Sequence, residues 1–190
     1  MIRENPFLGP RWEPLAQALA YVIGKTASGR TFHFQTYLHK YGLSPDTSPY
    51  LQAIIEDKFF HLEISGNLVL NPPLDEEGMR QMEFFGWHRP EATPEEYQDS
   101  HEGNPNFVRY YALDTPIDEV VEFLLTTLAG VFEATEDDFY AFTNGNTANE
   151  VDGLHLLGRL KKTDGNPDQV IFAFPGRHLD MVDRPKSRKK

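Results

Sequence analysis

Residues 50–65 read YLQAIIEDKFFHLEIS, and this stretch decides the fold. Two apolar runs flank Asp57-Lys58, a spacing that predicts two antiparallel strands joined by a two-residue turn. The register set by that turn places three apolar pairs on one side: Ile55 with Phe60, Ala53 with Leu62, and Leu51 with Ile64. A slip by one residue would bury His61 and Glu63, so we expect this register and no other.

Further elements surround the predicted hairpin. Apolar residues spaced three and four apart predict a helix over residues 11–27, and alternation from residue 30 to 38 predicts a strand. Asp75 is a suitable N-cap for a short second helix, and residues 107–113 have the pattern of a fourth strand. We interpret residues 89–106, which contain three prolines, as a long surface loop.

A long amphipathic helix is predicted to follow from residue 115. Thr115 is expected to cap it, with Pro116 at the first helical position and Asp118 in the reciprocal capping place. The order helix, three strands, helix, strand, long helix predicts an α+β fold, in which an antiparallel sheet carries helices packed on one face. No glycine-rich turn links a strand to a helix in the phosphate-binding pattern, which argues against a doubly wound nucleotide fold.

The last fifty residues have a weaker pattern. We expect strands over residues 138–142 and 170–174, and a helix near 148–162 with a capping box formed by Thr147 and Glu150. We therefore divide the chain into a domain of residues 1–140 and a C-terminal extension of residues 141–190. The extension ends in the basic stretch 184–190, which we interpret as a solvated, disordered end; contact with nucleic acid or an acidic partner is the alternative.

Composition limits the classes of function. The 190 residues carry a formal net charge of −11, which disfavours a general nucleic-acid role because phosphates would be repelled. The chain has no cysteine, which excludes disulfides and thiolate metal ligands. No apolar run approaches the ~20 residues that a membrane-spanning helix needs, and the first residues lack the apolar segment of a signal peptide. We expect a cytoplasmic protein with no membrane partner.

Several short motifs resemble those of a bacterial family. They are FQTYL at residues 34–38, SPYLQA at 48–53, HLEISGN at 61–67, NPPL at 71–74, FGW at 85–87 with Pro90, and PNF at 105–107. Over residues 12–140 the chain is similar to the TY-Chap superfamily, named for Tir chaperones and YbjN proteins. The resemblance implies a secretion-chaperone-like fold, a curved antiparallel sheet flanked by helices that is often dimeric, and a role in binding other proteins. Asp57-Lys58 departs from the family's glycine turn, which leaves the turn type open.

The side of the sheet away from the hairpin core is the candidate binding surface, which we call the open face. Seven residues should lie together there: His33, Gln35, Tyr37, Gln52, Ile54, His61 and Glu63. Aromatic and amide groups side by side suit a peptide-binding surface. A solvated sheet face, or a face covered by the C-terminal extension, is the alternative.

These observations favour a non-enzymatic module that binds another protein, as a chaperone for a secreted or toxic polypeptide whose basic charge would complement this acidic chain. An immunity-type protein that neutralises a toxin is the first alternative, and a metal-dependent enzyme acting on small molecules is the second. His33, His61 and Glu63 are the candidate metal ligands, and no nucleophile motif supports catalysis. We therefore expect no catalytic residue, cofactor or metal, no nucleic-acid partner, and we keep a homodimer open.

Overall fold

The computed structural model describes residues 5–25, 31–44, 46–56, 58–144, 159–163 and 166–173. Within this part of the chain, seven strands form one antiparallel sheet with the spatial order β4-β3-β2-β1-β5-β7-β6. The strands are β1 (Thr31–Tyr37), β2 (Tyr50–Ile55), β3 (Phe59–Ile64), β4 (Phe107–Ala112), β5 (Phe139–Asn144), β6 (Arg159–Thr163) and β7 (Asn166–Ala173). The helices are η1 (Pro10–Trp12), α1 (Glu13–Lys25), η2 (His39–Tyr41), α2 (Glu76–Phe84), α3 (Pro94–Ser100) and α4 (Ile117–Gly130).

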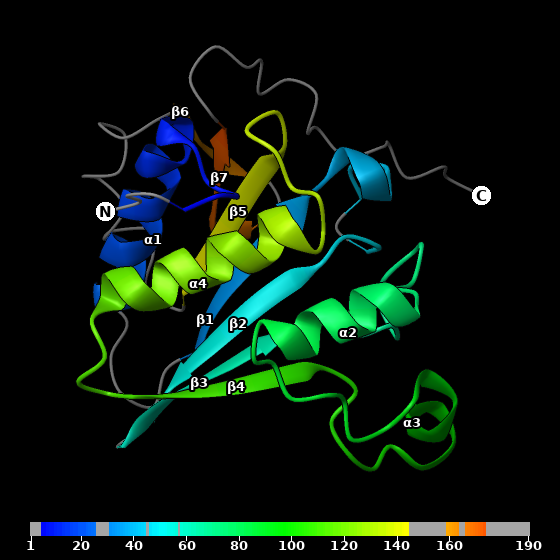
Figure 1. The fold of residues 1–190 in the computed structure, drawn as a ribbon. Helices are drawn as coiled ribbons and strands as arrows, with labels where there is room; N and C mark the ends of the chain where they lie inside the picture. Colours follow the sequence, from blue (N-terminus) through cyan, green and yellow to red (C-terminus); the bar gives the residue numbers. More distant parts are fainter. Residues whose placement is uncertain are drawn as a thin grey trace.

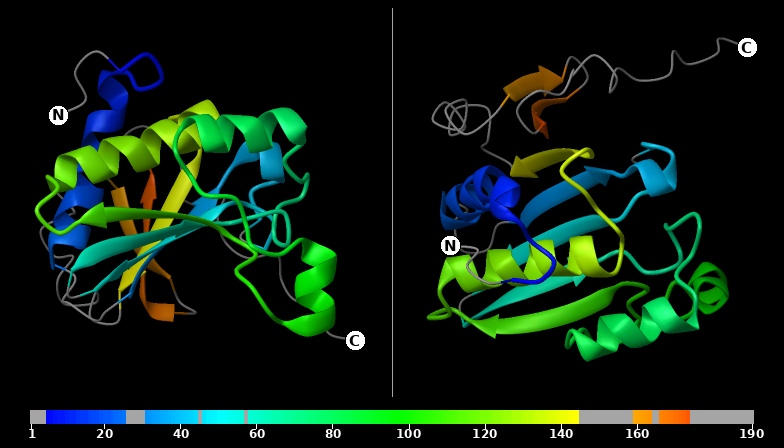
Figure 2. Two further views of the ribbon diagram at one scale, coloured as in Figure 1. Left: turned by 60° about the horizontal axis from the view of Figure 1, so that its bottom comes forward. Right: turned by 45° about the horizontal axis from the view of Figure 1, so that its top comes forward.

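Three helices cover one face of this sheet. Figure 1 shows α1, α2 and α4 on the same side of the strands, with α1 beside α4. In the left view of Figure 2, these three helices form one layer and the sheet forms the other. The short helix α3 stands apart from them, beyond the end of the sheet where β4 begins. The predicted α+β architecture, an antiparallel sheet with helices on one face, is confirmed.

The hairpin has the predicted register. Ile55 pairs with Phe60, and Leu51 pairs with Ile64 thirteen residues further along the chain. The backbone amide of Glu56 donates to the carbonyl oxygen of Phe59 at 3.0 Å, which closes the hairpin next to the turn. Because side chains alternate along a strand, this register sends Leu51, Ala53 and Ile55 to the same side as their three apolar partners.

The core lies between that side of the sheet and the helix layer. It is built from alternate strand residues and from one face of each long helix: Phe32, Phe34, Leu51, Ala53, Leu62 and Ile64 in the sheet, Leu15, Leu19, Val22 and Ile23 in α1, and Val120, Val121, Leu124, Leu125 and Leu128 in α4. Full burial of one such large apolar side chain stabilises the fold by about 1.5–3 kcal/mol. Apolar residues recur every three or four positions in the helices and every two positions in the strands. This spacing determines which face of each helix packs on which face of the sheet.

Arg109 of β4 connects the sheet to the end of α2. Its Nη1 donates to the carbonyl oxygens of Phe85 (3.2 Å) and Gly86 (2.7 Å). Its guanidinium carbon lies 4.8 Å and 4.4 Å from the ring centres of Tyr111 and Phe123. Gly86 has a φ of +92°, a backbone conformation that strains residues with a Cβ, so glycine is favoured at this helix end.

The prediction that all of residues 89–106 form a loop is wrong, because Pro94–Ser100 is the helix α3. Thr93 accepts from the amide of Glu96 at 3.2 Å, and the carboxylate of Glu96 accepts from the amide of Thr93 at 2.9 Å. This capping box satisfies two backbone amides that the first turn would otherwise leave without partners. The helix has no buried residue, so it lacks the apolar stripe by which helices are recognised in a sequence.

Two other predicted helix ends are wrong. The N-cap of α4 is Pro116, and no side chain caps this helix, so Thr115 does not hold the place we gave it. The predicted helix near 148–162 is wrong at its end, since Arg159–Thr163 forms β6. Thr147 and Glu150, the predicted capping pair, lie outside the described residues.

The sheet continues past residue 140, where we placed the boundary of the first domain. β5 (Phe139–Asn144) spans that position and pairs with β1 over its whole length, with Phe32 opposite Asn144 and Tyr37 opposite Phe139. β7 then pairs with β5, and β6 pairs with β7. Strands from the extension therefore widen the sheet by adding β5, β7 and β6 on the side of β1 away from the hairpin.

Candidate functional site

The seven residues of the predicted open face lie on one side of β1, β2 and β3. Strand pairing places His33 opposite Gln52 and Gln52 opposite Glu63, in one row across the three strands. Ile54 and His61 are opposite one another in the neighbouring row. Their exposure differs: His33 is exposed, Gln35, Gln52, Ile54 and His61 are half-buried, and Tyr37 and Glu63 are only 8 % exposed. The accessible part of the open face is therefore centred on His33, Gln52 and Ile54.

A hollow of about 610 Å³ opens at the end of this face that lies near α3, and we call it the groove. Tyr50 and Glu63 contribute to it from the sheet, and Leu68 and Val69 come from the turn after β3. Tyr97 reaches it from α3, and residues 103–106, just before β4, complete the lining together with residue 91. Two tyrosines, two aliphatic residues and two glutamates thus meet at one place.

Glu63 lies at the base of the groove, where neutral amides hold its carboxylate. Oε1 accepts from Nδ2 of Asn104 at 3.0 Å, and Oε2 accepts from Nδ2 of Asn106 at 3.3 Å and from Nε2 of Gln52. Nε2 of His61 lies 3.3 Å from Oε1, and this ring is charged only when protonated. Among the described residues, no lysine or arginine forms an ion pair with Glu63.

The segment before β4 is held rigidly against the end of β3. Gly66 approaches the carbonyl of Pro105 so closely that any Cβ would collide with it. The amide of Gly66 donates to Oδ1 of Asn106 at 3.3 Å. On the outer side, the amide of Asn104 donates to Oε2 of Glu91 at 3.2 Å, and the amide of Glu91 donates to the carbonyl of Asn104 at 2.8 Å. These contacts position both asparagine amides over the carboxylate of Glu63.

An aromatic cluster occupies the open face towards the edge strand β4. Tyr110, which is 51 % exposed, stacks on His61 with ring centres 4.9 Å apart and meets Phe59 edge-on at 5.5 Å. His88 lies 6.5 Å from the same ring and bridges the outer edge of β4 at Val108. Stacked rings with one accessible face suit contact with a partner's apolar or aromatic side chain.

The three candidate metal ligands are not brought together. Gln52 lies between His33 and Glu63 in the row that crosses the strands, so only His61 and Glu63 are neighbours. In the part of the chain that the structure describes, no group of three or more ligating side chains could hold a metal ion. Neighbouring protein atoms displace part of the water around the His33 ring, and this desolvation lowers its pKa from the ordinary value and favours the neutral imidazole.

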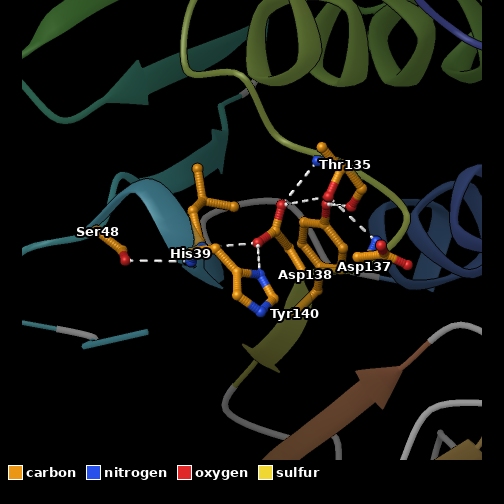
Figure 3. Close-up of polar contacts among 7 residues, drawn as sticks. His39, Ser48, Thr135, Asp137, Asp138 and Tyr140 are labelled. Atoms are coloured by element: carbon orange, nitrogen blue, oxygen red, sulfur yellow. Dashed lines mark hydrogen bonds and ion pairs between the residues drawn. The ribbon is translucent and has the colours of Figure 1, made fainter. Parts of the chain in front are cut away.

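A second polar cluster lies at the junction of β1, η2 and β5 (Figure 3). Oδ1 of Asp138 accepts from the backbone amide and from Nδ1 of His39, both at 2.7 Å, and Oδ2 accepts from the amide and hydroxyl of Thr135 at 2.7 and 3.0 Å. An aspartate that orients a histidine is half of a nucleophilic triad. Here the buried hydroxyl of Ser48 accepts from the amide of Leu38, so the contacts of this cluster fix the backbone around η2, and in the described residues no hydroxyl forms a hydrogen bond with the His39 ring.

Sequence reasoning missed most of the groove. It placed Glu63 on the open face but did not bring Tyr50, Tyr97, Asn104 or Asn106 to it. One signal for α3 was present in the sequence: Thr93, Pro94 and Glu96 have the spacing of a capping box with proline at the first helical position. That signal would have predicted the helix that contributes Tyr97 to the groove. The asparagine amides left no such signal, since their role depends on where residues 103–106 pack.

The comparison with protein families agrees with this arrangement. The model of TY-Chap3, described as T3SS (YopN, CesT) and YbjN peptide-binding chaperone 3, matches residues 8–144. The chain belongs to this family. The match covers β1 to β5 and the whole helix layer, and it ends at the last residue of β5. No curated protein and no solved structure matches the chain. Among the described helices of this TY-Chap3 member, none has the length and apolar character needed to cross a bilayer.

Proposed function

We propose that this TY-Chap3 protein is a non-enzymatic, cytoplasmic chaperone-like module that holds an extended segment of a secreted or toxic polypeptide on its open face. One observation carries the proposal: in a chain of a peptide-binding chaperone family, the three helices that pack on the sheet, α1, α2 and α4, all lie on the side away from the open face. A sheet face that carries imidazole, amide and aliphatic groups can bind a peptide's backbone and side chains together.

The surface chemistry supports a polypeptide ligand. His33, Gln52 and Ile54 are accessible at the centre of the open face, and Tyr110 extends it to the edge strand. Amides and a neutral imidazole donate and accept hydrogen bonds without a strong charge of their own. The net charge of −11 adds long-range attraction for a basic segment, which raises the rate of encounter.

The test is a selection of random linear peptides on the full chain, followed by affinity measurements with two open-face variants, His33→Lys and Ile54→Lys. Both substitutions place a charge at the centre of the open face without removing a core side chain. We expect selected peptides to bind at least about tenfold more weakly to each variant, a loss of ~1.4 kcal/mol, by isothermal titration calorimetry.

Phe84→Lys is the matched control, because Phe84 is 89 % exposed at the end of α2 on the helix side. This variant should bind the selected peptides as the parent does. Equal binding by the two open-face variants, or a selection that yields no linear peptide while a folded protein binds, would contradict a chaperone that grips an extended segment.

A further inference from the structure

We propose that the groove at Glu63 is a subsite for a single arginine or lysine side chain of the bound polypeptide. This inference rests on the proposed function, because it names the side chain that the peptide presents at one end of the open face. Glu63 would be the counter-ion of this side chain, and Tyr50 and Tyr97 would contact it from the sides of the groove.

The first argument is the charge of Glu63. A carboxylate that is 8 % exposed has lost most of its hydration, and a buried charge is costly unless it is paired. Gln52, Asn104 and Asn106 supply hydrogen bonds but no positive charge. An ionised carboxylate offers about four lone-pair sites, so these amides leave room for a further donor. A cation entering from the groove would complete the environment of Glu63.

The second argument is pre-organisation. Each asparagine that holds Glu63 is itself fixed: the amide of Asn106 donates to Oδ1 of Asn104 at 2.9 Å, and Nδ2 of Asn106 also lies 3.1 Å from the hydroxyl of Tyr50. A carboxylate held in place loses little entropy when a ligand arrives. A surface glutamate without such neighbours would have to give up side-chain freedom to form the same ion pair.

The third argument is the shape and chemistry of the walls. Tyr50 and Tyr97 line the groove, and guanidinium and ammonium groups bind to aromatic faces. Leu68 and Val69 offer aliphatic contact to the methylene stem that precedes the charged group. Glu91 is a second glutamate of the lining and is exposed, so the groove carries one solvent-facing and one buried acidic residue. An anionic or purely apolar side chain would find no matching group at the base.

His61 is the competing counter-ion within the chain, and its position limits that role. Its Nε2 lies 3.3 Å from Oε1 of Glu63 but forms no hydrogen bond in the described structure, and its ring is stacked on Tyr110. His61 is not part of the groove lining. A ligand cation can therefore reach Glu63 from the groove without displacing this ring.

The experiment uses the ¹⁵N-labelled full chain and two small probes, Nα-acetyl-arginine methylamide and its neutral isostere Nα-acetyl-citrulline methylamide. The side-chain amide signals of Asn104, Asn106 and Gln52 report on the groove. We expect the arginine probe to shift them saturably, with a dissociation constant on the order of 1–10 mM for so small a ligand. The citrulline probe should leave them in place, and so should the arginine probe added to Glu63→Gln.

Glu119→Gln, which makes the same charge change on the exposed helix side, is the control and should respond as the parent does. Unchanged thermal unfolding of Glu63→Gln shows that loss of binding is not loss of fold. Equal shifts with arginine and citrulline, or shifts that persist in Glu63→Gln, would overturn the subsite.

A second arm separates this inference from the function it rests on. In a selected peptide, replacing its arginine by citrulline should weaken binding to the parent about tenfold and binding to Glu63→Gln by less than about twofold. Peptides that bind the open face but tolerate citrulline everywhere would leave the function standing and refute the subsite. If no peptide can be selected but the arginine probe still binds in the groove, the proposed function is refuted and the cation subsite stands.

Discussion

Single residues set the geometry of the groove, and Gly66 is the most constrained of them. Its Cα passes so close to the carbonyl of Pro105 that a side chain cannot be inserted without moving the backbone. That contact aligns Asn106 with the amide of Gly66 and with the carboxylate of Glu63. Gly66 has no side chain to contact the proposed ligand, yet its position determines the orientation of the Glu63 carboxylate.

Gly66→Ala should destabilise the fold and loosen the groove together. Overpacking at a rigid backbone contact costs about 1–3 kcal/mol, which for a chain of this length lowers Tm by roughly 2–4 °C per kcal/mol. The arginine probe should bind more weakly to the folded variant because the asparagine amides shift. Gly9→Ala is the matched control: the nearest atom to its Cβ would be 4.0 Å away, so Tm should hardly change. A Gly66→Ala protein with parental Tm would refute the close approach.

At the scale of elements, α3 depends on its ends. It has seven residues and none is buried, so tertiary packing contributes little to it and the capping box at Thr93 and Glu96 contributes much. Helix α4 is the opposite case. It has no side-chain cap, and six buried residues hold it in place.

Thr93→Ala should therefore unfold α3 locally while leaving the rest of the protein intact. Loss of the cap costs about 1 kcal/mol, a roughly fivefold change in the opening equilibrium. The amides of Tyr97 and His101, which donate to the carbonyls of Thr93 and Tyr97, should exchange with deuterium about five times faster, with Tm unchanged. Thr115→Ala is the control, because that side chain does not cap α4. Equal exchange in both variants would show that the capping box does not support α3.

These elements also show how far the sequence leads. The hairpin register was predictable because a slip by one residue would turn the apolar residues of one strand away from the core, and the two-residue turn excludes larger slips. The long helices were predictable because their apolar stripes are unbroken. Helix α3 was missed because it has no stripe, and the groove was missed because it joins residues 50, 63, 97 and 104 across separate elements. The spacing of apolar residues within one element does not predict which side chains of separate elements come together in the fold.

At the scale of the whole molecule, one sheet combines two parts of the chain. Every buried core residue whose side chain the structure describes lies between Leu8 and Tyr140. The family match ends at Asn144, the last residue of β5, and β1 is paired on both sides only when β5 is present. The functional unit that we propose therefore ends after β5, a few residues beyond the boundary at 140 that the sequence indicated.

A chain of residues 1–144 should fold cooperatively, whereas a chain of residues 1–140 should be markedly less stable. The shorter chain removes the four β5 residues that face Phe32, His33, Phe34 and Gln35, and so leaves this stretch of β1 paired with β2 alone. In the longer chain β5 becomes an edge, because β7 no longer covers it, so self-association at high concentration is expected. Thermal unfolding by circular dichroism and light scattering after gel filtration would measure both effects. Equal stability of the two truncated chains would mean that β5 adds nothing to the sheet that carries the open face.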